Sequence, residues 1–256
     1  TPSFNVNQQR QIFHCFGCGI GGDVFRFVME REGVDFVTAV KMLARRAGVD
    51  IKLEEDREPG VDKDVLYAIH EALAQFYRRC LLRMPSASVA REYIEKRRLP
   101  AEVCEDFLIG YAPKRWDAAT QWADKHGYSL EKLEQAGVIT RNTRPNARSD
   151  YYDRFRNRLM FPIRDEQSRV IGFSGRSLDP DDKGAKYVNS PETPLFHKSR
   201  ILYALDRARR HITEAGVAIV CEGQIDVIRC HHAGFANAVA SQGTAFTEDH
   251  VRILRR

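Results

Sequence analysis

The stretch RLMFPIRDEQSRVIGFSGRSL, residues 158–178, contains two apolar runs that flank a polar turn at 165–168. Runs of this length joined by a short polar turn are typical of a β-hairpin. Upstream of the hairpin, apolar residues recur at helical spacing, so the period changes from helix to strand at this point. The sequence therefore predicts an α+β fold.

The regions on either side of the hairpin differ in pattern. Upstream, helical periodicity predicts helices over 65–82, 88–97, 100–107, 116–125 and 130–135. Downstream, VAIVC (217–221) and ANAVA (236–240) are predicted strands, a helix is expected over 225–232 between them, and another begins at Thr247. Alternation of strand and helix predicts a parallel sheet.

The N-terminal residues are predicted to form a small unit of their own. In HCFGCG (14–19), Cys15 and Cys18 stand on a glycine-rich turn at the spacing with which two thiolates bind one zinc ion. Two helices follow, the second with Asp35 as its N-cap and Gly48 as its C-cap. So small a unit buries little apolar surface, and a metal ion is a common source of its stability.

Charge and composition suggest where the units divide. The charged segment KLEEDREPGVDK (52–63), with its Pro-Gly break, predicts a linker. We therefore expect four parts: a partial zinc-binding unit at 1–49, a linker at 50–63, a mixed α/β core at 64–215 and a parallel α/β unit at 216–256.

The composition limits the classes of function. The 256 residues include 40 Lys+Arg and 35 Asp+Glu, and the resulting net charge of +5 favours a polyanionic partner. Six scattered cysteines fit reduced thiols better than a disulfide framework. Because the sequence has neither a signal peptide nor an apolar run of membrane-spanning length, we expect a cytoplasmic protein without a membrane partner. We further expect it to be nucleoid-associated and monomeric.

Glu222 is the first candidate for chemistry. It directly follows the strand VAIVC and precedes a helix, so it lies at the carboxyl end of a strand, where α/β sheets collect their ligands. A carboxylate there can act as a base or hold a hard cation such as Mg²⁺. The alternative is a structural acid at a helix N-terminus.

Two cationic segments are candidates for phosphate binding. Arg154, Arg156 and Arg158 recur with a period of two, so an extended chain would place all three on one face. The alternative is an edge strand protected by charge. The proline-containing loop KYVNSPETPLFHKS (186–199) contains cations, an aromatic ring and polar groups that suit either a nucleotide site or an ordinary polar loop.

These stretches, in this order, resemble bacterial DnaG-type DNA primases over nearly the whole chain. TPSFNVN and FHCFGCGIGGDVFRFVM are similar to the second half of the family's CHC2 zinc-binding domain. The segments that resemble its RNA polymerase domain, which runs into a Toprim fold, are YIEKRRL, IGYAP, YDRFRNRLMFPIRD, RVIGFSGR, KYVNSPETPLFHK, LYAL, VCEGQIDVI and AVASQGTAFT.

The resemblance implies a DNA-directed RNA polymerase that makes short RNA primers on single-stranded DNA from ribonucleoside triphosphates, with Mg²⁺ or Mn²⁺. It implies a basic ridge and nucleotide site that include Arg97, Arg176, Lys186, Tyr187, Asn189 and Lys198. It also implies contacts of the whole protein with the replicative helicase DnaB and a single-strand-binding protein. The family has glycine where this chain has Arg98, which bears on the direction of Arg97.

In the family, a Cys-x-x-His pair before the TPSF segment completes the zinc site with the cysteines that match Cys15 and Cys18. An Asp-x-Asp pair on a later strand completes the catalytic metal site with the glutamate that matches Glu222. Neither pair occurs in this sequence, so we expect half of each site and no primer synthesis by this chain alone.

Two alternatives remain open. A phage-type primase fused to a helicase also joins a zinc unit to a Toprim fold, but it would contain a Walker A motif, which is absent from these residues. A non-catalytic module that binds single-stranded DNA would differ in lacking the later Asp-x-Asp strand.

Overall fold

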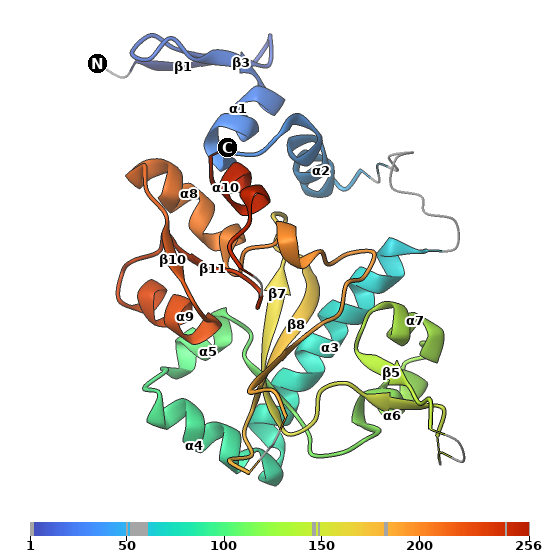
Figure 1. The fold of residues 1–256 in the computed structure, drawn as a ribbon. Helices are drawn as coiled ribbons and strands as arrows, with labels where there is room; N and C mark the ends of the chain where they lie inside the picture. Colours follow the sequence, from blue (N-terminus) through green and yellow to red (C-terminus); the bar gives the residue numbers. More distant parts are fainter. Residues whose placement is uncertain are drawn as a thin grey trace.

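The computed structural model describes residues 3–49, 51, 61–144, 147, 149–181, 184–243 and 245–255. Most of the predicted linker at 50–63 lies outside these residues. The elements in chain order, drawn in Figure 1, are β1 (Phe4–Asn7), β2 (Ile12–Cys15), β3 (Gly21–Asp23), α1 (Val24–Glu32), α2 (Phe36–Ala47), α3 (Lys63–Arg83), η2 (Pro85–Ala87), α4 (Ser88–Lys96), α5 (Ala101–Asp106), β4 (Gly110–Ala112), α6 (Ala118–Lys125), α7 (Leu130–Gln135), β5 (Ile139–Arg141), β6 (Tyr151–Asp153), β7 (Arg158–Arg164), β8 (Val170–Ser177), β9 (Tyr187–Asn189), η3 (Lys198–Arg200), α8 (Leu205–Ala215), β10 (Ile219–Cys221), α9 (Gln224–His232), β11 (Ala238–Ala240) and α10 (Glu248–Leu254).

The predicted hairpin is confirmed as the centre of the largest sheet. Strands β7 and β8 pair antiparallel from Arg158 with Ser177 to Ile163 with Gly172, and the sheet order is β4-β7-β8-β9. The long helix α3 packs against β4 and β8. This approach is close: a Cβ on Gly110 of β4 would lie 2.6 Å from Cβ of Tyr77 on α3.

A histidine is buried where α3 meets α7. The His70 ring nitrogens lie 2.7 Å from the Leu66 carbonyl oxygen and 3.0 Å from that of Ala136. Burial lowers the pKa of His70 to about 4, so the ring is neutral near pH 7. It therefore belongs to the core rather than to a reactive site.

The C-terminal unit has the predicted parallel pair. Ile219 of β10 pairs with Ala238 of β11, and α9 packs beside both strands. Helix α8 was not predicted. Its buried residues Leu205, Ala208 and Ile212 recur at helical spacing on one face of an otherwise charged segment, a pattern that the sequence analysis overlooked.

The N-terminal unit is an antiparallel sheet of order β1-β2-β3 followed by α1 and α2. The predicted caps of α2 are confirmed: the Asp35 side chain accepts from the Thr38 N–H, and Gly48 has φ 68°. Strands β1 and β3 were not predicted, because three or four mostly exposed residues give no clear alternation.

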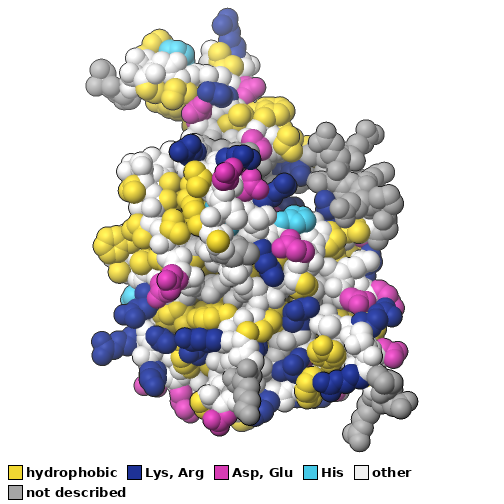
Figure 2. All heavy atoms as spheres, viewed as in Figure 1, with side chains coloured by type: hydrophobic (Ala, Val, Ile, Leu, Met, Phe, Trp, Pro, Cys, Tyr) yellow, Lys and Arg dark blue, Asp and Glu magenta, His cyan; other side chains and the backbone are white. Residues whose placement is uncertain are grey.

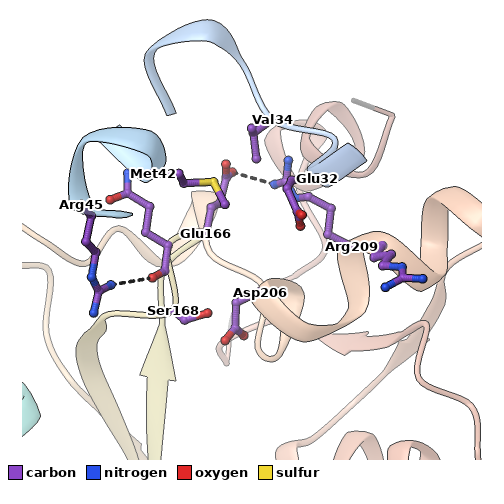
Figure 3. Close-up of a pocket in the computed structure, with 10 residues that line it drawn as sticks. Glu32, Val34, Met42, Arg45, Glu166, Ser168, Asp206 and Arg209 are labelled. Atoms are coloured by element: carbon purple, nitrogen blue, oxygen red, sulfur yellow. Dashed lines mark hydrogen bonds and ion pairs between the residues drawn. The ribbon is translucent and has the colours of Figure 1, made fainter. Parts of the chain in front are cut away.

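Arg209 of α8 connects the N-terminal unit to the core. Its guanidinium donates to the Gly33 carbonyl, and its Nη2 atom lies 2.9 Å from Oε1 of Glu166, which is in the turn between β7 and β8. Figure 3 shows these side chains beside a cavity of about 230 Å³ that both units line. A second contact joins the same two units, because Arg45 of α2 in the N-terminal unit donates to the Gln167 carbonyl in the β7–β8 turn over 3.4 Å.

Within the described residues, no helix has the length and apolar character needed to cross a membrane.

Arg98 ends α4 in an unfavourable backbone conformation. It has φ 52°, its N–H donates to the Glu95 carbonyl over 2.8 Å, and the Leu99 N–H donates to that of Ile94 over 3.2 Å. This pair of bonds is the usual helix ending in which glycine is favoured, because a Cβ is strained at positive φ. The arginine therefore makes a turn that favours glycine, at a cost in free energy.

We predict that Arg98→Gly stabilises the chain. Relief of the strain should raise the free energy of unfolding by about 0.5–1 kcal/mol, measured by urea denaturation. Arg98→Ala is the matched control, because it removes the charge and keeps the Cβ. If Arg98→Gly and Arg98→Ala had equal free energies of unfolding, the backbone at this position would not be strained by the Cβ.

Candidate nucleic-acid interface

Backbone hydrogen bonds close the turn that carries Cys15 and Cys18. The Cys15 N–H donates to the Ile20 carbonyl over 2.7 Å, and Gly19 donates back to the Cys15 carbonyl over 2.8 Å. Hydrogen bonds from Cys18, the Gly17 N–H and the Ser3 hydroxyl lower the pKa of the Cys15 thiol to about 7. The thiolate needed for zinc is thus favoured. No group of three or more His, Cys, Asp or Glu able to hold a metal occurs within the described ranges.

Two arginines that the resemblance implied meet around one tyrosine. Arg97, at the end of α4, donates Nε–H to the Tyr93 hydroxyl over 2.7 Å. Arg176, on β8, places its Cζ atom 3.9 Å from the Tyr93 ring centroid. Among the residues that the structure describes, neither Arg97 nor Arg176 has an ion-pair partner, so their charge is available to an anion. In Figure 2, Lys and Arg side chains gather on the surface over α4 and α5.

Strand β9 places Tyr187 beside this pair. Tyr187 is paired with Arg176 across β8 and β9. Burial is the main cause that raises the pKa of the Tyr187 hydroxyl; Tyr93 and Asp226 raise it further, and Arg176 opposes them. The core and the C-terminal unit therefore both contribute to this site. Lys186, which precedes β9, is exposed and forms no ion pair with a carboxylate of the described residues.

Asn189 connects β9 to the start of α9. Its Nδ2 donates to the Gln242 carbonyl over 2.9 Å, and Gln224 donates Nε2–H to Oε1 of Gln242 over 3.2 Å. Gln224 is the first residue of α9, and the exposed Glu222 stands two residues before it. Asn189 Oδ1 and Gln242 Nε2 are buried and have no hydrogen-bond partner among the described residues. These orphaned groups suit a polar ligand.

The backbone of Lys198 is held on both sides. Its N–H donates to Glu192 Oε1 over 3.1 Å, and its carbonyl lies 3.2 Å from Nε2 of the buried His250. Lys198 thus begins η3 at a fixed position next to α10.

The prediction of one face for Arg154, Arg156 and Arg158 is wrong. The chain is not extended there, because Asn157 has φ 50° and β7 begins only at Arg158. Arg158 is 8% exposed, and its guanidinium donates to carbonyls of β8 and of the segment before β9. Burial lowers the pKa of Arg154, whose Nε has no partner among the described residues. Arg154 and Arg156 are both half-buried, and the Arg156 guanidinium donates to the Asp153 carbonyl.

Arg156 forms an aromatic and cationic platform that the sequence analysis missed. Its Cζ atom is 4.0 Å from the Trp116 ring centroid and 5.5 Å from that of Tyr152. Trp116 is 64% exposed, an unusual state for the largest apolar side chain. The helix predicted over 116–125 included Trp116, whereas α6 begins at Ala118. The sequence could not show that Trp116 is exposed, because its exposure depends on where α6 begins.

Comparisons with known proteins agree over the whole chain. Residues 76–209 match the DNA primase catalytic core, N-terminal domain; residues 1–59 match the CHC2 zinc finger; and residues 216–256 match the Toprim domain. The DNA primase of Halalkalibacterium halodurans is 42% identical over 260 residues, which cover 100% of this chain and 42% of that protein. The chain thus spans less than half the length of this relative.

Solved structures lead to the same family. The RNA polymerase domain of Mycobacterium tuberculosis primase DnaG, in complex with a double-stranded DNA oligomer with a 6-nucleotide overhang, is 40% identical with a TM-score of 0.71, over 76% of this chain and 59% of that one. The zinc-binding and RNA polymerase domains of Aquifex aeolicus primase are 36% identical with a TM-score of 0.67, over 100% of this chain and 60% of that one. The α+β fold expected from the sequence is confirmed, and the chain belongs to the DnaG-type DNA primase family.

Proposed function

We propose that this chain forms the template- and nucleotide-binding part of a primase that makes RNA primers on single-stranded DNA. The observation that carries the proposal is the group of Arg97, Arg176 and Tyr187 around Tyr93, next to the turn that begins α9. Two guanidinium groups without carboxylate partners within the described residues suit phosphate oxygens, to which arginine donates in a fork.

The nucleotide would lie between β9 and the start of α9. The buried Asn189 Oδ1 and Gln242 Nε2 atoms could bond to its polar groups, and Lys186 and Lys198 would add positive charge. Glu222, at the carboxyl end of β10, would face the reacting phosphates as a base or as a ligand of Mg²⁺ or Mn²⁺. When bound, such an ion offsets the negative charge of a triphosphate. Cys15 and Cys18 would provide two ligands of a structural zinc ion.

The template would cross the platform of Trp116, Tyr152 and Arg156. Stacking of a base on an exposed aromatic ring stabilises a single strand by about 1–3 kcal/mol without selecting a sequence. Arg156 precedes Asn157, and β7 begins directly after Asn157. Because Leu159 near the start of β7 pairs with Arg176, the platform adjoins the end of the hairpin that carries Arg176. We also propose that the whole protein contacts DnaB and a single-strand-binding protein, and this part of the proposal rests on the family resemblance alone.

We predict that single-stranded DNA changes the fluorescence of Trp116. The chain has a second tryptophan, Trp122, but it is 4% exposed and inside α6, so a change on titration with an oligonucleotide reports on Trp116. Trp116→Phe should abolish this change. Arg156→Ala should weaken binding. It should also reduce the steepness of the slope of log affinity against log salt by about 0.7, the value for one single-strand phosphate contact.

Arg210→Ala is the matched control for Arg156, because Arg210 is an exposed arginine of α8 that pairs with Glu214. It should leave the affinity and the salt dependence unchanged. Unchanged binding by both Trp116→Phe and Arg156→Ala would exclude this platform from the template path.

We predict that Glu222→Gln in the full-length protein abolishes primer synthesis and preserves template binding. The substitution keeps the side chain's size but removes its charge, so the incorporation of radiolabelled ribonucleotides should fall on the order of 100-fold or more. Affinity for single-stranded DNA, measured by fluorescence anisotropy, should stay within about twofold because binding depends on cations.

Glu214→Gln is the control for this experiment, as it neutralises an exposed carboxylate of α8. Near wild-type synthesis by Glu222→Gln would show that Glu222 is a structural acid at a helix start. Template binding without any synthesis by the wild-type protein would instead favour the non-catalytic module.

A further inference from the structure

Two cysteines face each other beside Glu222. Cys221 is the last residue of β10 and Cys230 lies in α9, and their Sγ atoms are 4.0 Å apart. Both side chains are partly exposed and pack at the margin of the same apolar cluster. A disulfide bond is about 2.05 Å long, so side-chain rotation and a small movement of α9 would join the two sulfurs.

The chain between the cysteines makes this closure favourable. Residues 222–229 alone separate them, and the strand and helix that carry them already pack together. A short, preordered loop has little entropy left to lose when it closes. The other thiols differ: Cys80 and Cys104 are buried, and Cys15 and Cys18 lie on the turn of the N-terminal unit.

We propose that Cys221 and Cys230 are a modification site at which a peroxide forms an intramolecular disulfide across the turn that holds Glu222. The Cys230 sulfur, as a thiolate, attacks the O–O bond of the peroxide; its S–O bond forms, the O–O bond breaks and, after protonation, water leaves. The second thiol then attacks the resulting sulfenic acid, and the S–S bond forms with loss of a second water. The two thiols are oxidised, and hydrogen peroxide is reduced to two waters.

The bond would hold α9 against β10. Glu222 and Gly223 lie inside the closed loop, so oxidation would limit how this turn can move. The inference does not depend on the proposed function, since it concerns only the two sulfurs.

Tryptic mapping tests the proposal directly. Cleavage after Arg210, Arg229 and Arg252 puts Cys221 in peptide 211–229 and Cys230 in peptide 230–252. The chain is treated with hydrogen peroxide, its free thiols are alkylated without reduction, and the digest is analysed by mass spectrometry. We expect a peptide pair lighter than its two parts by two hydrogen atoms, which disappears on reduction, from protein that stays monomeric on a non-reducing gel.

Controls separate this bond from general oxidation. Cys80→Ser should form the linked pair as wild type does, and Cys230→Ser should not form it. Because the readout on the wild-type chain needs no variant, a folding defect in either one cannot hide the result. Recovery of 211–229 and 230–252 only as separate alkylated or overoxidised peptides would overturn the proposal, as would a linked pair found only in a dimer.

Discussion

The arrangement of the interface depends on one buried guanidinium, that of Arg158. A buried charge is costly unless its donors are satisfied, and Arg158 donates to the Gly175 carbonyl over 2.9 Å and to that of Ala185 over 3.1 Å. These bonds tie the first residue of β7 to β8 and to the segment before β9. Gly175 is required here, because a Cβ would lie 2.8 Å from the Phe155 ring and 3.0 Å from Arg158 Cδ. The hairpin and the segment at 184–186 are therefore held as one body.

From this body, contacts extend to both neighbouring units. Strand β9 follows this fixed segment directly, so the segment also fixes the positions of Tyr187 and Asn189. Hydrogen bonds from Asn189 to Gln242 and from Gln224 to Gln242 then connect β9 to the first turn of α9. At the opposite end of the hairpin, the β7–β8 turn meets Arg209 and the N-terminal unit. Glu222 and the cationic residues thus occupy one region although they come from separate units.

The sequence predicted the elements whose pattern is local. Helix α3 and the hairpin each have a run of apolar residues long enough to show its period. The parallel pair, with three residues in each strand, was predicted from the short apolar runs at 217–221 and 236–240. Strands β4, β5, β6 and β9 have three residues each, which is too short for a period. Strand β4 pairs with the distant β7, whereas β5 with β6 and β8 with β9 are neighbours in the chain. Their existence is decided by tertiary contacts rather than by propensity.

The site was predictable only in part, for the same reason. Residues Arg97, Arg176 and Tyr187 came from the family resemblance, and the structure brings them together; their roles remain proposals. The period of two in 154–158 was misleading because a single left-handed residue, Asn157, interrupts the strand. Nor could the sequence show that Arg158 is internal, since its partners lie at least 17 positions away. The exposure of Trp116 likewise depends on where α6 begins.

The central claim, that Arg158 acts on nucleic-acid binding only by placing the segment before β9, is tested most directly by a double-mutant cycle with Lys186. Affinity for single-stranded DNA would be measured by anisotropy for Arg158→Lys, Lys186→Ala and the double variant, after urea denaturation has shown that each is folded. Lysine keeps the charge but cannot reach several carbonyls at once. The account predicts that Lys186→Ala weakens binding in the wild-type background and has little further effect once Arg158 is replaced. Additive losses would contradict it, because independent residues contribute independently to binding.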